Sequence, residues 1–154
     1  MSRTYISASL RRMVFERANG NCEYCLIPEG LALASHQVDH SISEKHGGET
    51  VSENLALPCS FCNQTKGSDV GFIDGETGAY IRLYHPRRDR WVDHFEMNEE
   101  TGDILGMSAV GRVTVRLLQM NRSAYLLERL LLLQAGVLVL PGVVDKRFGE
   151  GRST

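Results

Sequence analysis

Two pairs of cysteines constrain this chain more than any other feature. Cys22 and Cys25 form one C-x2-C pair, Cys59 and Cys62 form the second, and 33 residues separate the pairs. All four cysteines of the sequence lie in these pairs. Two residues between thiolates let one pair present both sulfurs to a single tetrahedral ion, and two such pairs complete its coordination. The spacing therefore predicts a Zn²⁺ site that joins two distant segments.

Redox pairs and disulfides are the alternatives to zinc. The N-terminus has no apolar leader segment, so we expect no signal peptide and a cytoplasmic location, where thiols stay reduced. Neither pair lies in a thioredoxin-like βαβ pattern, which argues against independent redox or idle pairs. Because four protein ligands leave the ion no open position, we expect this Zn²⁺ to be structural and not catalytic.

The segment between the cysteine pairs carries a candidate hydrolytic site. Asp39 and His40 stand at the end of a stretch with strand character, where both side chains can reach one cleft. Oxygen ligands from Asp39 and Asn63 suit Mg²⁺ or Mn²⁺. His40 is a candidate general base, because an imidazole titrates near neutral pH. Asn54 can fix the orientation of the imidazole ring.

The ordered pattern C-x2-C, Asp-His, Gly-Gly, Asn-Leu and C-x2-C-Asn-x2-Lys resembles the HNH endonucleases, the zinc-containing branch of the ββα-metal nucleases. The resemblance implies that Asp39 and Asn63 hold one divalent cation. It also implies that His40 activates water and that Asn54 orients His40. Lys66 matches a lysine that is frequent in the family and would contact phosphate. Asn63 stands where the family name gives a histidine, a variant that occurs in the family.

The resemblance covers about residues 10 to 70 and implies metal-assisted hydrolysis of phosphodiester bonds in DNA, with 5′-phosphate products. We expect weak sequence preference, because a helix at the minor groove leaves little base readout. A non-catalytic zinc-ribbon module that binds nucleic acid or protein is the alternative from a different class. An enzyme that nicks DNA or cleaves RNA with the same site is a third possibility.

The charge of the chain bears on its partner. Lys and Arg number 17, Asp and Glu number 19, and the net charge of −2 requires a local basic patch for any nucleic acid. Arg87, Arg88 and Arg90 form the densest basic cluster, which predicts either a phosphate-binding patch or a solvated turn. Other arginines are interpreted as polar helix faces: Arg11, Arg12, Arg17, Arg112, Arg116 and Arg122.

Periodicity and turn residues predict an α+β fold. We expect helices over residues 7–18, 60–66, 108–120 and 123–134, and strands over residues 31–42, 55–57, 80–83, 91–97 and 104–105. The longest apolar run, residues 130–140, is too short to span a bilayer, so we expect no membrane partner. Asp93-His94 repeats the Asp-His dipeptide away from any cysteine pair, and we interpret it as structural.

The expected organisation is a ββα-metal nuclease core stapled by a four-cysteine zinc site. Four segments make up this arrangement within one compact domain: the core with its N-terminal helix at residues 1–70, a β-hairpin extension at 71–107, a helical pair packing on the core at 108–140, and a loose tail at 141–154. The tail is rich in glycine and charge.

Overall fold

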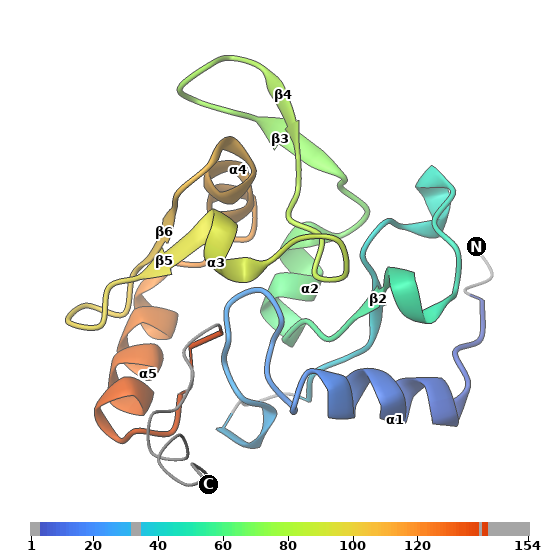
Figure 1. Ribbon diagram of the computed structural model, residues 1–154, viewed down its shortest axis with the longest axis horizontal. Coiled ribbons are helices and arrows are strands. Elements are labelled where there is room, and N and C mark those ends of the chain that lie inside the picture. The colour runs from blue at the N-terminus through green and yellow to red at the C-terminus, as the bar shows by residue number, and fades with distance from the viewer. Residues whose placement is uncertain (1–3, 32–34, 139, 142–154) are drawn as a thin grey trace, which may run out of the picture.

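The computed structural model of this protein describes residues 4–31, 35–138 and 140–141. Figure 1 shows small antiparallel hairpins with helices packed beside them, which confirms the α+β class. All but the first residue of the predicted tail, together with residues 32–34 of the strand predicted over 31–42, lie outside the described residues. None of the helices in the described part is long and apolar enough to cross a membrane.

The described elements alternate between short helices and two-stranded hairpins. The helices are α1 (Ala8–Arg17), α2 (Ser60–Lys66), α3 (Trp91–His94), α4 (Ala109–Leu117) and α5 (Ser123–Gln134). The strands are β1 (Asp39–His40), β2 (Leu55–Ala56), β3 (Gly71–Ile73), β4 (Tyr80–Arg82), β5 (Phe95–Met97) and β6 (Ile104–Gly106). Antiparallel pairing joins β1 to β2, β3 to β4, and β5 to β6. The predicted helices over residues 60–66 and 123–134 are confirmed to the residue.

Two predicted strands are wrong over much of their length. Among the described residues of the first, only Asp39–His40 is strand, because the register places Gln37 opposite Pro58 and Pro58 has no N–H to return a ladder hydrogen bond. In the second, residues 91–94 form α3 and only 95–97 are strand. Trp91 and Phe95 are both buried, and a spacing of four residues fits one face of a strand as well as one face of a helix. The strand β3 was not expected from the sequence.

The first helix closes one side of the core. The Ser7 side chain accepts a hydrogen bond from the backbone N–H of Leu10 and caps α1, while Val14 is fully buried. The interpretation of Arg17 as part of a solvated polar helix face is wrong. Its guanidinium donates to the backbone carbonyls of Ser52 and Leu55 at 3.1 and 2.9 Å. The helix α1 is thereby tied to the start of β2.

The main hydrophobic cluster contains residues from Cys22 to Leu138, while Ile6 and Val14 belong to a second, smaller cluster with Leu55 and Leu57. The main cluster joins both cysteine pairs to the later hairpins and helices, and its buried members include Tyr24, Ile27, Trp91, Phe95, Ile104, Leu118, Met120 and Leu132. The indole nitrogen of Trp91 donates to the carbonyl of Tyr24 at 3.0 Å. The helix α3 therefore fixes the position of the segment between Cys22 and Cys25 through this hydrogen bond.

The helix α4 holds the two later hairpins together. Asp74, in the β3–β4 turn, accepts hydrogen bonds from Arg112 at 3.2 and 2.9 Å, so Arg112 is a contact residue and not only a polar face. Arg112 lowers the pKa of Asp74 to about 2. Gly111 is required because a Cβ there would lie 2.0 Å from the carbonyl oxygen of His94.

Candidate metal centre and catalytic loop

The four cysteine sulfurs meet at one point in the interior. The ligand atoms of Cys22, Cys25, Cys59 and Cys62 all lie within 4.8 Å of one another, and all four residues are buried. The sulfurs of Cys25 and Cys59 are 3.7 Å apart. Tetrahedral Zn²⁺ with Zn–S bonds of about 2.3 Å places its sulfurs about 3.8 Å apart. The side chains therefore fit a zinc site with four thiolate ligands, as the spacing predicted.

Backbone hydrogen bonds to the sulfurs and the charge of the thiolates both favour binding of a cation by this cluster. The backbone N–H of Cys25 donates to the sulfur of Cys22, and that of Cys62 to the sulfur of Cys59, each at 3.4 Å. Contacts with the Cys22 sulfur and the other thiols raise the pKa of Cys25 and Cys62 and lower the pKa of Cys59. A bound dication would favour the ionised form of all four thiols.

The hairpin β1–β2 presents the Asp-His pair. Asp39 pairs with Ala56 and His40 with Leu55, and the loop between them begins with a 2.7 Å hydrogen bond from the Ser41 N–H to the Asn54 carbonyl. The Asp39 side chain is 28% exposed and the His40 side chain 12% exposed. The loop therefore covers most of the imidazole while the carboxylate remains accessible.

A threonine that the sequence reasoning missed holds the His40 ring. The Nε2 atom of His40 lies 2.8 Å from the Thr50 hydroxyl oxygen, and that hydroxyl donates to Glu44 at 3.4 Å. Hydrogen bonds from Thr4 lower the pKa of Glu44, which favours the charged, accepting carboxylate. When the hydroxyl donates to Glu44, Thr50 accepts a hydrogen bond from Nε2–H, and the lone pair of neutral His40 then lies on Nδ1.

Asn54 closes the catalytic loop instead of bonding to the ring. Its Oδ1 accepts from the Ile42 N–H, and its Nδ2 donates to the carbonyls of Ile42 and Glu49, each at 2.9 Å. Within the described part of the chain no hydrogen bond joins Asn54 to the His40 ring. Gly48 packs against the Ile42 carbonyl and the Asn54 amide. A Cβ at this position would be 1.7 Å from the Ile42 carbonyl oxygen. Asn54 thus shapes the loop that carries Thr50.

Lys66 lies beneath the hairpin. Its side chain is 1% exposed, and its Nζ donates to the His40 carbonyl at 2.9 Å and lies 3.4 Å from Asp39 Oδ2. In this position it braces β1 and does not face a phosphate. Asn63 is half-buried and lies three residues earlier on α2, so both residues share one helix face. The structure therefore brings α2 and the Asp-His pair together.

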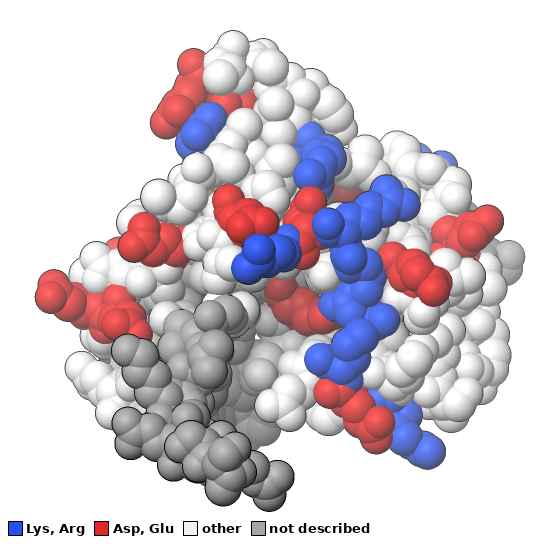
Figure 2. Space-filling model, in the orientation of Figure 1, with Lys and Arg blue, Asp and Glu red and all other residues white. Residues whose placement is uncertain are grey.

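The basic cluster divides into one packed arginine and two exposed ones. Arg87 pairs with Glu23, whose other carboxylate oxygen accepts from the Leu57 N–H at 2.9 Å. Burial, and then the charge of Arg17, lower the pKa of Arg87 to about 10, so it is charged at neutral pH. Arg88 and Arg90 are exposed. Figure 2 shows a narrow line of Lys and Arg side chains on this face, flanked by Asp and Glu.

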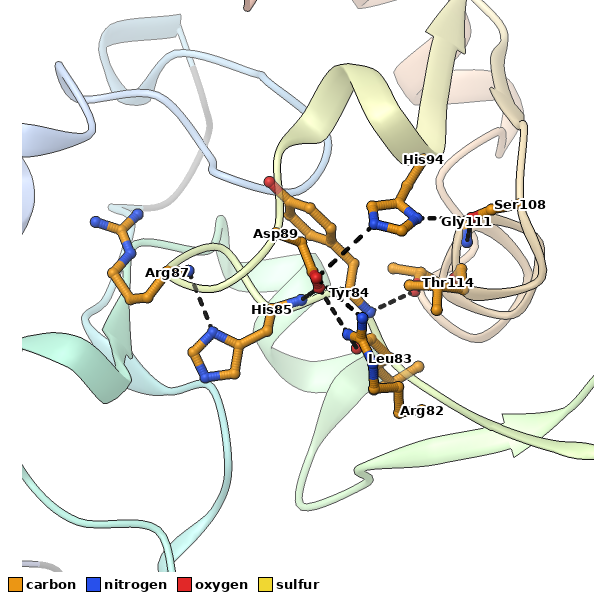
Figure 3. Close-up of polar contacts among 11 residues, drawn as sticks. Arg82, Leu83, Tyr84, His85, Arg87, Asp89, His94, Ser108, Gly111 and Thr114 are labelled. Carbon is orange, nitrogen blue, oxygen red and sulfur yellow. Dashed lines mark hydrogen bonds and ion pairs between the residues drawn. The ribbon is translucent and has the colours of Figure 1, made fainter.

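The second Asp-His dipeptide belongs to a structural network. Nδ1 of His94 lies 2.7 Å from the Ser108 hydroxyl, which also caps α4, and Nε2 lies 3.8 Å from Asp89. Figure 3 shows His94 between these two side chains, with Arg82 on the far side of Asp89. Arg87 points away from this network. His94 thus fastens α3 to α4, as the structural interpretation of the sequence expected.

Comparison with known proteins gives a family match for one segment of the chain. The family model described as HNH endonuclease matches residues 22–69. That segment contains both cysteine pairs, the Asp-His pair, the loop closed by Asn54, and α2. No curated protein and no solved structure gave a significant match to the chain.

Proposed function

We propose that this chain, whose residues 22–69 match the family model of the HNH endonucleases, is a metal-dependent endonuclease that hydrolyses phosphodiester bonds in DNA. The observation that carries the proposal is the setting of His40. The Thr50 hydroxyl lies 2.8 Å from Nε2 of His40, and we assign the ring proton to Nε2 and the proton-accepting lone pair to Nδ1. An imidazole held in one tautomer beside a carboxylate is suited to general base catalysis.

In the proposed reaction, Nδ1 of His40 takes a proton from a water molecule. The water oxygen forms a bond to phosphorus as the bond from phosphorus to the 3′ oxygen breaks, in line with the attack. The departing 3′ oxygen takes a proton from solvent, and the product strand carries a 5′-phosphate. Thr50 keeps the imidazole in position throughout, because its hydroxyl is itself held by Glu44 at 3.4 Å.

We assign Asp39 and Asn63 to a divalent cation, Mg²⁺ or Mn²⁺. Their carboxylate and amide oxygens are donors of the type these ions prefer, and the Asp39 side chain is accessible. When bound, the cation supplies Lewis-acid stabilisation of the charge on the departing oxygen. Lys66 holds Asp39 from below and so limits where the carboxylate can move.

The DNA backbone would be contacted by the exposed arginines of the loop that follows β4. Arg88 and Arg90 are exposed, whereas Arg87 is engaged with Glu23. Because the chain has a net charge of −2, such contacts must come from a local line of basic residues. Figure 2 shows a line of basic side chains that runs from the centre of this face toward α1.

A plasmid cleavage assay with Mg²⁺ or Mn²⁺ tests the proposal. His40→Ala should reduce cleavage by about 10²-fold or more, the scale of a missing general base, while zinc content and DNA affinity stay unchanged. His46→Ala is the matched control, because His46 is exposed in the same loop and should leave cleavage intact. Both variants should melt near the wild-type temperature.

The outcome that overturns the proposal is a wild-type protein that binds nucleic acid but never cuts it. If neither DNA nor RNA is cleaved with Mg²⁺, Mn²⁺ or Ni²⁺, the non-catalytic zinc-ribbon binding module is the correct function. Cleavage of RNA alone, or conversion of plasmid only to the nicked form, would assign the same residues to an RNA-cleaving or nicking enzyme.

A further inference from the structure

The helix α5 turns one face toward the second cysteine pair, although it lies outside residues 22–69. Arg122, its N-cap, and Tyr125 and Arg129 within it stand three and seven residues apart along that face. The Tyr125 hydroxyl lies 3.6 Å from the sulfur of Cys59. Phe61, between the two cysteines of the pair, packs edge-on against the Tyr125 ring, with ring centroids 5.3 Å apart.

Arg122 completes this contact from the start of the helix. Its guanidinium lies 3.5 Å from the centroid of the Phe61 ring, a cation–π geometry, and 5.3 Å from that of Tyr125. The edge-to-face packing of the two rings fixes the position and rotation of α5 relative to α2. The approach of the Tyr125 hydroxyl to Cys59 is therefore set by packing on both sides.

Arg129 is a fully buried cation surrounded by neutral acceptors. Its side chain is 0% exposed, and it donates to the carbonyls of Gly102 and Met120 at 2.8 and 2.6 Å and to Asn121 Oδ1 at 3.1 Å. Its remaining terminal nitrogen is buried and has no hydrogen-bond partner. In the described part of the chain no carboxylate forms an ion pair with it. A buried charge is costly unless another charge compensates it.

The negative groups that act on this guanidinium are cysteine thiols and Asp103. Burial lowers the pKa of Arg129. The thiols of Cys25 and Cys62 act to raise this pKa, and Asp103 raises it to a smaller extent. A Zn²⁺ ion with four thiolates carries two positive and four negative charges, which leaves a net charge of −2 in the interior. A fully buried guanidinium and a buried zinc–thiolate centre of this charge would relieve each other's desolvation.

We propose that α5 forms the outer shell of the zinc centre: the Tyr125 hydroxyl donates a hydrogen bond to the Cys59 thiolate, and the buried Arg129 guanidinium offsets the negative charge of the four thiolates. Zinc retention then depends on a helix more than 50 residues beyond the second cysteine pair. The alternative is that Arg129 only staples α5 to the β5–β6 turn and to the end of α4 through its backbone contacts.

Zinc release separates the two explanations. The purified full-length protein is held with excess chromogenic chelator at a temperature well below the melting midpoint of every variant. Arg129→Met keeps the length of the side chain and removes its charge, and zinc should leave this variant about 10- to 100-fold faster, the scale of outer-shell effects on metal affinity. Arg116→Met is the matched control, because Arg116 is exposed on α4, and its zinc release should equal that of wild type.

Tyr125→Phe tests the hydrogen bond without disturbing the packed rings. It should accelerate zinc release severalfold while the melting temperature changes little. In Co²⁺-substituted protein it should also shift the thiolate-to-metal charge-transfer absorption to lower energy, because the thiolate loses a hydrogen-bond donor. A purely structural role for the hydroxyl would leave this absorption in place.

The proposal is overturned if zinc release from folded Arg129→Met and Tyr125→Phe stays within about twofold of wild type, well below the effect expected of an outer shell. Should Arg129→Met fail to fold, unchanged release and an unchanged Co²⁺ spectrum in Tyr125→Phe overturn it equally. A wild-type protein that purifies without zinc has the same consequence. None of these measurements uses DNA cleavage, so their failure is distinguishable from failure of the proposed nuclease function.

Discussion

The ammonium group of Lys66 lies 2.9 Å from the backbone carbonyl oxygen of His40, and the Lys66 side chain is 1% exposed. The same ammonium lies 3.4 Å from the Asp39 carboxylate. The helix α2, which begins inside the second cysteine pair, therefore fixes the position of the strand that carries the proposed base. Through this contact the thiol cluster is linked to the candidate catalytic loop.

Replacing Lys66 by Met should destabilise the protein by about 1–3 kcal/mol, because the buried His40 carbonyl loses its partner. Thermal unfolding would show this loss, and cleavage should fall with it because β1 is no longer braced. Lys45→Met serves as the control, since Lys45 is exposed. If Lys66→Met melts normally but shows a shallower salt dependence of DNA binding, Lys66 contacts phosphate after all.

The Thr50 hydroxyl should matter for catalysis through the orientation of His40. Thr50→Val removes the acceptor for Nε2–H and should lower kcat by about 10-fold, part of the general-base contribution, with KM unchanged. Thr50→Ser keeps the hydroxyl and should restore most of the activity. Steady-state kinetics on a short duplex would show the split. Equal activity of the Val and Ser variants would remove Thr50 from the mechanism.

The exposed arginines should determine the salt dependence of DNA binding. Replacing Arg88 and Arg90 together by Ala should reduce the slope of log affinity against log salt by about 1.8, or about 0.9 for each lost phosphate contact. Arg87→Ala should leave the slope unchanged and lower the melting temperature, because Glu23 loses its buried partner. Fluorescence anisotropy at several salt concentrations measures both. An unchanged slope in the double variant would make the cluster a solvated turn.

The zinc should be part of the fold. Zinc bound by thiolates contributes on the order of 10 kcal/mol in small peptides, more than the net stability of most domains. Cys59→Ser should therefore yield protein that is poorly soluble or partly unfolded, with a zinc content well below one ion per chain. Metal analysis and circular dichroism of the purified variant test this. A zinc-free Cys59→Ser protein with wild-type melting would contradict a structural role.

The sequence by itself determined the elements that depend on local spacing. The two C-x2-C pairs predicted the thiol cluster, because two intervening residues bring both sulfurs of a pair to one side. The ends of α2 followed from Pro58 before it and Gly67 after it, and the end of α5 followed from Gly136. Ser123, expected to cap α5, is its first helical residue, and the N-cap is Arg122. These features depend on neighbours within a few residues, which sequence patterns record well.

Only the tertiary structure decided which polar groups meet. The partners of Arg17 and Lys66 lie 26 to 38 residues away in the sequence, and Tyr125 reaches Cys59 across 66 residues. Periodicity indicates which side of a helix is buried, but it does not say what a buried polar group will meet there. Lys66 thus proved to brace β1, and Thr50, not Asn54, holds the His40 ring. The physical reason is that a buried donor must find its acceptor wherever the packed core places one.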